Sequence, residues 1–382
     1  MYYFDNAATT KLEPKVLESM LPYLNENYGN ASSIYSLGQK SKDAIETARE
    51  KVANSLGCES KNIFFTSSGS ESDNWAIKGV AFANRDKGNH IITTSIEHHA
   101  VLDTCDYLKK HGFEITYLPV KKNGIVDLEQ LKKEIRNDTI LISVMYANNE
   151  IGTIQPVEQI GEIAKEKGIY LHTDAVQAIG NIEINLDNLN VDLLTLAGHK
   201  FNGPKGIGAL YIKDGVKIDN LIHGGGQEKG KRASTENIAN IVGLGTAIEL
   251  ATKDIKKKTK YLTLLREICI EGIMKKIPDT ILNGDAEKRL PGNVNVCFKY
   301  IEGESILLML DQLGICASSG SACTSGSLDP SHVLLAIGLP HEIAHGSLRL
   351  SFSKDNTKKE VEYLLDVLPD IVEKLRRMSP LK

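Results

Sequence analysis

The central part of the chain alternates short apolar runs with stretches of helical spacing. Apolar runs of strand length occur at 63–66, 90–94, 140–144, 169–174 and 191–196. Continuous runs of this kind are typical of strands that are buried on both faces of a sheet. Helical spacing precedes the first run at 41–56, which Gly57 closes, and fills the gap at 156–168. The alternation predicts an α/β fold with a mostly parallel sheet and helices on both faces.

The pattern changes after residue 252. A long helical stretch reaches Ile277, and strand-like segments follow at 293–298 and 347–352 before a terminal helix. Separate helices and strands of this kind indicate an α+β unit. We therefore predict a large domain over 14–252 and a smaller domain formed by 1–13 and 253–382.

Composition agrees with a globular protein of two domains. The chain has 382 residues, of which 41% are hydrophobic and 25% charged, and its net charge of −4 gives no broad attraction to nucleic acid. The basic run Lys256–Lys258 is interpreted as the solvated face of a helix. The start of the chain lacks the basic and apolar regions of a signal peptide, and no apolar run is long enough to span a membrane. These features favour a cytoplasmic location.

Six cysteines are scattered along the chain, at positions 58, 105, 269, 297, 316 and 323. No CxxC pair is present, which argues against a zinc ribbon or a thioredoxin motif, and we interpret them as reduced thiols. Cys323 stands out because small residues surround it throughout 318–327. Such a loop, about 318–328, suits a nucleophile that must travel, although a plain linker would also look like this. Cys316 is interpreted as a small core residue of a short strand.

Several polar residues follow the predicted strands, where ligands bind in open α/β sheets. Gly69 and Ser70 lie between a strand and a helix, a position that favours phosphate. Asp174 ends a strand, and Lys200 follows another strand in a glycine-rich setting. Each has a plain explanation alone, such as a helix cap or a solvated lysine. Together they are the parts that pyridoxal phosphate requires: amides for the phosphate, a carboxylate for the ring nitrogen and a lysine for the aldehyde.

Motifs along nearly the whole chain resemble the cysteine desulfurases of the NifS/IscS type, which are PLP-dependent enzymes like the class V aminotransferases. The matching segments are 4–10 (FDNAATT), 65–74 (FTSSGSESDN), 97–98, 148–152 (NNEIG), 172–177 (HTDAVQ), 198–200 (GHK), 224–228 (GGGQE) and 318–333. The resemblance implies a PLP-dependent aminotransferase-like fold of type I, with the small domain carrying the cysteine loop.

The resemblance also implies roles around the cofactor. Lys200 would form the Schiff base, His98 would stack on the pyridine ring and help in proton transfer, and Asp174 would pair with the ring nitrogen. Gln177 would bind the ring hydroxyl group. The phosphate would be held by Gly69, Ser70 and His199, joined by Thr235 from the other subunit of a homodimer.

For the substrate, the resemblance implies that Asn149 and Arg349 bind the carboxylate of L-cysteine, with Asn149 also among the cofactor contacts. Arg suits this role because its fork matches a carboxylate. The Cys323 thiolate would take the sulfur as a persulfide, leaving L-alanine. The sulfur would pass to an iron–sulfur scaffold or to an enzyme of tRNA or cofactor thiolation. No resident metal is expected, although a scaffold partner could use Cys323 as a transient iron–sulfur ligand.

Two positions depart from the family pattern. Ala197 stands where the family usually has serine, so one hydroxyl contact to the phosphate is missing. Ser234 stands where the family usually has glycine, which costs stability if the backbone needs a positive φ. Both concern cofactor affinity and loop geometry, and neither changes the reaction class.

Other functions remain as alternatives. A selenocysteine lyase or another class V aminotransferase-like enzyme would share the fold, but an aminotransferase has no use for Cys323 in such a loop. A docking protein without activity would have no reason to keep Lys200, Asp174 and His98. A zinc hydrolase built on His98 and His99 ranks low, because no HExxH is present and neighbouring residues on an extended strand point to opposite sides.

Overall fold

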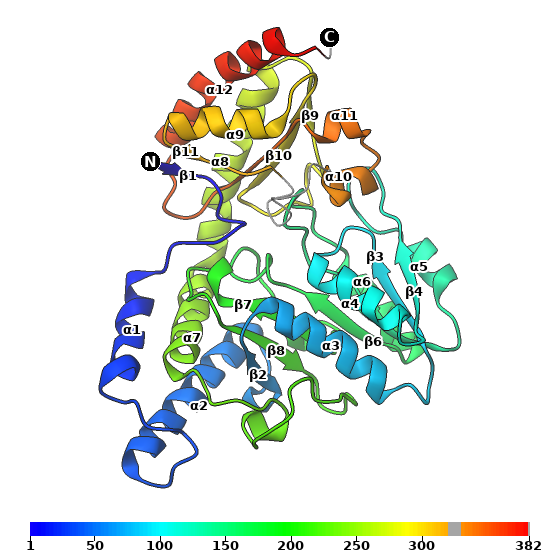
Figure 1. Cartoon of the computed structure of the whole chain (residues 1–382), viewed down its shortest axis with the longest axis vertical. Coiled ribbons are helices and arrows are strands. Elements are labelled where there is room, and N and C mark those ends of the chain that lie inside the picture. Colours follow the sequence, from blue (N-terminus) through cyan, green and yellow to red (C-terminus); the bar gives the residue numbers. More distant parts are fainter. Residues whose placement is uncertain (320–329, 381–382) are drawn as a thin grey trace.

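A seven-stranded sheet forms the centre of the larger part of the molecule. The computed structural model describes residues 1–319 and 330–380. In spatial order the strands are β2 (Ile63–Thr66), β8 (Gly208–Ile212), β7 (Leu193–Ala197), β6 (Tyr170–Asp174), β5 (Thr139–Ser143), β3 (His90–Thr94) and β4 (Glu114–Leu118). β8 runs antiparallel to β2 and β7, and the other neighbours are parallel. The prediction of a mostly parallel sheet is confirmed (Figure 1).

Both faces of this sheet are covered by helices. Successive strand residues enter different cores: Phe64 and Leu141 pack in one, and Phe65 and Ile142 in the other. The first core contains α3 (Gly69–Ala83) and α4 (His99–Lys109). The second contains α1 (Pro14–Asn25), α2 (Ser36–Leu56), α5 (Leu128–Glu134), α6 (Val157–Lys167) and α7 (Ile238–Lys253). Burial on both faces explains why the strands read as continuous apolar runs.

A smaller α+β part lies above the sheet in Figure 1. Its antiparallel sheet has the order β12 (Ser347–Ser351), β10 (Asn293–Phe298), β9 (Thr280–Leu282). The helices of this part are α8 (Ile255–Lys276), α9 (Gly303–Gln312), α10 (His332–Ala336), α11 (His341–Ala344) and α12 (Lys358–Met378). β1 (Tyr2–Tyr3) pairs with β11 (Ile315–Cys316), and Phe4 packs in the same core. The domain boundaries at 13/14 and 252/253 stay predictions.

Some local expectations differ from the structure. The helix expected at 41–56 begins at Ser36, and Pro156 precedes α6 rather than opening it. Lys256 and Lys257 are exposed, but Lys258 is half-buried and its Nζ donates to the Gly180 carbonyl at 2.6 Å. The solvated-face interpretation is therefore wrong for Lys258. None of the helices in the described part of the chain combines the length and apolar character that a membrane span requires.

Candidate active site

A cavity of about 390 Å³ lies beyond the carboxyl ends of the central strands. This volume is typical of small-molecule sites. Of the predicted site residues, the cavity wall contains Gly69, Ser70, His98, Asn149, Asp174, Gln177, His199, Lys200 and Arg349. Thr235 is exposed and does not line the cavity of its own chain, and Cys323 lies outside the described residues.

The N-terminus of α3 forms one end of the cavity. Ser68 caps the helix by accepting a hydrogen bond from the Glu71 amide at 3.1 Å, and Gly69 and Ser70 open its first turn. The first amides of a helix have no intrahelical acceptor, and the helix dipole favours an anion there. A Cβ on Gly69 would come within 2.9 Å of Cγ2 of Val176. The glycine therefore lets α3 approach the segment that follows β6.

Asp174 ends β6 and is buried at the cavity wall. Its Oδ1 accepts a hydrogen bond from the Val176 amide at 2.9 Å. Burial raises the pKa of Asp174, while the charges of His98 and Lys200 and the Val176 amide oppose this rise. A protonated ring nitrogen beside Asp174 would supply the positive charge that a buried carboxylate requires.

His98 is the N-cap residue of α4. Its Nδ1 accepts a hydrogen bond from the Ala100 amide at 3.1 Å, so the neutral ring carries its proton on Nε2. Burial lowers the pKa of His98, which favours this neutral form. His99 is the first residue of α4, so the premise that these two histidines lie on an extended strand is wrong.

Lys200 follows β7 and points at the N-terminal segment. Its Nζ donates to the carbonyls of Ala7 at 2.7 Å and Ala8 at 2.8 Å. Gln177 donates to the Ala7 carbonyl as well, at 2.9 Å. The N-terminal segment thus closes one side of the cavity and holds the amine at its wall.

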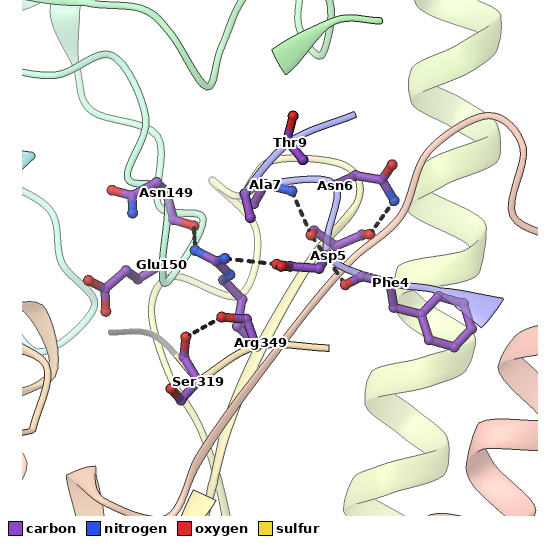
Figure 2. A network of polar contacts seen from close by, with 12 residues as sticks. Phe4, Asp5, Asn6, Ala7, Thr9, Asn149, Glu150, Ser319 and Arg349 are labelled. Carbon is purple, nitrogen blue, oxygen red and sulfur yellow. Dashed lines mark hydrogen bonds and ion pairs between the residues drawn. The ribbon is translucent and has the colours of Figure 1, made fainter. Parts of the chain in front are cut away.

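Arg349 comes from β12 of the smaller part and is 2% exposed. Its guanidinium lies between the Asn149 carbonyl, at 3.2 Å from Nη1, and the Asp5 carboxylate, at 2.9 Å from Nη2 (Figure 2). The Nε group is buried and has no hydrogen-bond partner within residues 1–319 and 330–380. A buried donor without a partner costs about 1–3 kcal/mol, and a ligand carboxylate would supply the acceptor that the described residues do not.

His199 and the two departures from the family pattern concern the phosphate end. His199 Nδ1 lies 3.2 Å from Oγ1 of Thr9, and burial lowers the His199 pKa to about 4, so its ring is neutral at neutral pH. Ala197 lines the cavity with a methyl group only. Ser234 has a positive φ of 130°, the conformation expected at a position where the family usually has glycine.

The sequence reasoning missed several residues of the cavity wall. They are Ala7, Ala8, Ser68, Asp73, Met145, Ala147 and Val176. Five of them belong to the matching motifs but had no assigned role: Ala7, Ala8, Ser68, Asp73 and Val176. Asp73 could have been found, because it lies one helical turn beyond Gly69 on the same helix. Cys316 lies on the expected short strand β11 but is only half-buried.

Comparison with known proteins decides the family. The aminotransferase class-V model matches residues 2–364. Cysteine desulfurase IscS of Methanosarcina thermophila is 62% identical over 379 residues, which cover 99% of this chain and 94% of that protein. This chain belongs to the cysteine desulfurase family of class-V aminotransferases.

Solved structures of the family have the same fold. A NifS-like protein matches with a TM-score of 0.92 and 42% identity over 98% of this chain and all of that one. SspA in complex with cysteine matches with a TM-score of 0.83 and 39% identity, over 94% of this chain and all of that one. The predicted aminotransferase-like fold and the resemblance to cysteine desulfurases are confirmed.

Cysteine desulfurases are PLP-dependent, and the cavity fits this cofactor. One end offers helix amides for a phosphate, the wall offers a buried carboxylate, and Lys200 places an amine between them. The buried Asp73 and Arg349 also carry polar atoms with no hydrogen-bond partner in the described part of the chain. The donor and acceptor set therefore matches an anionic, ring-nitrogen-containing aldehyde and an amino-acid carboxylate.

Proposed function

We propose that this chain removes sulfur from L-cysteine, releasing L-alanine and leaving a persulfide on Cys323. The observation that carries this proposal is the buried Nε of Arg349, which has no hydrogen-bond partner among residues 1–319 and 330–380 and belongs to the same cavity as Lys200 and Asp174. A buried arginine donor at this place fits the carboxylate of an amino acid, and the lysine fits its amino group through the cofactor. The family and the cysteine named with the SspA structure support the choice of amino acid.

The roles of the side chains follow from their positions. Lys200 would hold the cofactor, Asp174 would face its ring nitrogen, and the first turn of α3 with His199 would hold its phosphate. When bound, the cofactor supplies an electron sink that makes the Cα proton of the substrate acidic. Lys200 would remove this proton, because its Nζ is an amine at the cavity wall, held by the carbonyls of Ala7 and Ala8. His98, neutral and protonated on Nε2, would assist as a hydrogen-bond donor.

Sulfur transfer needs no external oxidant. The Cys323 thiolate would attack the substrate sulfur, forming the S–S bond as the Cβ–S bond breaks. The electron pair of the broken bond would stay with the carbon skeleton, which takes up a proton and leaves as L-alanine. Enzyme thiol and cysteine thus become enzyme persulfide and alanine, with atoms and electrons balanced.

We also propose that the enzyme works as a homodimer. Thr235 is exposed on its own chain, which suits a residue that completes the phosphate site of a second copy. α1 carries apolar residues on two faces: Val16 and Met20 are buried, and Leu17, Leu21 and Leu24 are exposed. Tyr28, Ile34 and Tyr35 extend this exposed apolar surface. An exposed apolar stripe of this kind is typical of an interaction surface, and a second copy is the occupant we assign to it.

The sulfur on Cys323 needs an acceptor in the compartment where the enzyme works. An iron–sulfur scaffold or an enzyme of tRNA or cofactor thiolation would accept the persulfide sulfur, with Cys323 as a transient iron–sulfur ligand in the first case. A cytoplasmic location fits, because the five cysteines within the described ranges are free thiols.

Incubation with L-cysteine tests the function. We expect stoichiometric or catalytic alanine release and one extra sulfur on the Cys323 peptide by mass spectrometry. Cys323→Ser should stay folded, bind PLP and fail to form alanine at a useful rate. Extra sulfur on Cys316 instead would overturn the choice of nucleophile. Alanine formed faster from selenocysteine than from cysteine would support the selenocysteine lyase alternative.

A further inference from the structure

A second buried carboxyl group lies in the wall of the cavity. Asp73 projects from α3, is 1% exposed and lines the same cavity as Asp174. Its Oδ1 is buried and has no hydrogen-bond partner in the part of the chain that the structure describes. Leaving a carboxyl oxygen in this state is costly, so a proton or a ligand atom is expected there.

The neighbouring histidine does not supply a positive charge. Nε2 of His172 lies 3.5 Å from Oδ1 of Asp73. The same ring is held by the Ser143 hydroxyl, at 2.8 Å from Nδ1, and by the Thr195 hydroxyl, at 3.1 Å from Nε2. Complete burial lowers the pKa of His172 to about 3, so the ring is neutral. An ionised Asp73 would gain no compensation from it.

Other acids surround Asp73. Burial raises the pKa of Asp73 well above its ordinary value, and the negative charges of Asp174 and Glu97 raise it further. A hydrogen bond from Thr195 opposes this rise. Burial also raises the pKa of Glu97 to about 8, although its oxygens accept hydrogen bonds from the Thr94 hydroxyl and the Met145 amide. Two carboxylates cannot both ionise readily in one buried site.

We propose that Asp73 and Asp174 form a carboxyl pair that holds one proton, and that Asp73 supplies this proton to the ring nitrogen of the cofactor. The inference rests on the proposed function, because it needs the ring nitrogen to face Asp174. On binding, the proton leaves the pair and bonds to the ring nitrogen. The two carboxylates then share the positive charge of the ring, and the net charge of the site stays the same.

Proton counting tests the pair without any turnover. The full chain, freed of cofactor, is titrated with PLP by calorimetry in two buffers of different ionisation enthalpy, at a pH where free PLP has an unprotonated ring. Asp73→Asn should take up about one more proton per site than the parent, because its ring proton must come from solvent. Ser72→Ala is the matched control, since Ser72 lies beside Asp73 but outside the cavity lining, with its hydroxyl on the Thr66 hydroxyl and the Ser68 carbonyl. Equal proton counts in Asp73→Asn and the parent would overturn the proposal.

An infrared measurement on the parent alone keeps the proposal testable if Asp73→Asn does not fold. The cofactor-free parent should show the C=O stretches of protonated carboxyl groups, and PLP binding should remove the intensity of one of them, while the band of Glu97 remains. An unchanged total intensity after saturation with PLP would refute proton donation by the pair. Protein that does not bind PLP at all would contradict the proposed function instead, so the two failures are distinguishable.

Discussion

Ser234 holds a backbone conformation that glycine adopts at lower cost. Its φ of 130° is positive, and its side chain makes only a long contact of 3.4 Å from Oγ to the Thr235 carbonyl. A non-glycine residue in such a region strains the folded backbone by about 1–3 kcal/mol. Glycine removes this strain, but its greater conformational freedom in the unfolded chain offsets part of the gain in stability.

We therefore expect Ser234→Gly to raise the free energy of unfolding by about 1 kcal/mol, measured by denaturant titration with PLP bound. Ser234→Ala keeps the Cβ and is the control: it should show no gain. A gain of equal size in both variants would mean that the hydroxyl group, not the backbone, carries the strain.

Lys258 should make stability depend on pH. Burial lowers its pKa from 10.5 to about 8 in the folded protein, with Lys354 adding to the drop and Asp355 opposing it. Between these two values the unfolded chain binds more protons, so stability rises with pH. Below about pH 8 the folded protein carries the full cost of a buried charge on Lys258. This cost decreases as the pH rises from about 8 to 10.5 and is gone once the lysine of the unfolded chain has also lost its proton.

Lys258→Met should remove this dependence. The measured quantity is the free energy of unfolding of the variant minus that of the parent. It should fall by up to about 3 kcal/mol between neutral pH and the ordinary lysine pKa, because each tenfold change in proton affinity corresponds to about 1.4 kcal/mol. Lys257→Met, exposed on the same helix, should give a flat difference. A flat difference for Lys258→Met as well would show that the buried amine keeps an ordinary pKa.

At the residue scale, the sequence predicts the site where a motif supplies the chemistry. Lys200 and Asp174 could be named because, with Gly69 and Ser70, they are the parts that PLP requires, and the family resemblance added His98. Asp73 could have been placed at the cavity by its spacing from Gly69, but Lys258 could not be placed, because its role depends on which face of α8 packs inward. Long-range packing decides this, and Lys258 stands in a run of three lysines that looks uniformly solvated.

At the scale of elements, the approach of α3 to the segment after β6 shapes the end of the cavity where we expect the phosphate. Gly69→Ala would place a Cβ 2.9 Å from Cγ2 of Val176 and push the first turn away. Overpacking of this kind costs about 1–3 kcal/mol. PLP affinity, measured by the change in intrinsic fluorescence, should fall about tenfold, which corresponds to about 1.4 kcal/mol.

Val176→Ala removes the methyl group that Gly69→Ala would contact. The double variant should regain most of the PLP affinity, and Val176→Ala alone should bind like the parent. An equal loss in the single and the double variant would show that the clash is not the cause.

Strands could be predicted where burial on both faces makes the sequence apolar over several consecutive residues. β3, β5 and β6 are buried on both faces and read as apolar runs. β4 was missed because it is an edge strand with the half-exposed sequence Glu114–Leu118. β8 was missed because it follows the glycine-rich turn after Lys200, and its antiparallel direction depends on pairing between β2 and β7.

At the scale of the whole molecule, the site combines segments that lie far apart in the chain. Arg349 of the smaller part meets Asn149 and Asp5 at the cavity, as Figure 2 shows. The resemblance to cysteine desulfurases brought Arg349 and Asn149 together, and composition or spacing alone would not have done so; it gave Asp5 no role. A residue that a second chain supplies has no signal in the periodicity of one chain, so Thr235 stays a prediction.

Mixed dimers provide the test of this last assignment. In a dimer of Lys200→Ala and Thr235→Val chains, the one site with Lys200 would receive Thr235 from its partner. The second dimer joins a parent chain to a chain that carries both Lys200→Ala and Thr235→Val. Its one site with Lys200 would receive valine from the partner instead. We expect the first to bind PLP with parent affinity and the second about tenfold more weakly, because a hydrogen bond to a charged phosphate is lost.

The measurement counts the PLP that borohydride fixes to Lys200 in dimers purified through two different tags. Dimers of two parent chains carrying the same tags are the control. If Thr235 served the phosphate of its own chain, the order would reverse, because the Thr235→Val chain would then lack threonine in the site that keeps Lys200. A fully active species that light scattering shows to be a monomer would also refute the assignment, since a second chain would then be unnecessary for the phosphate site.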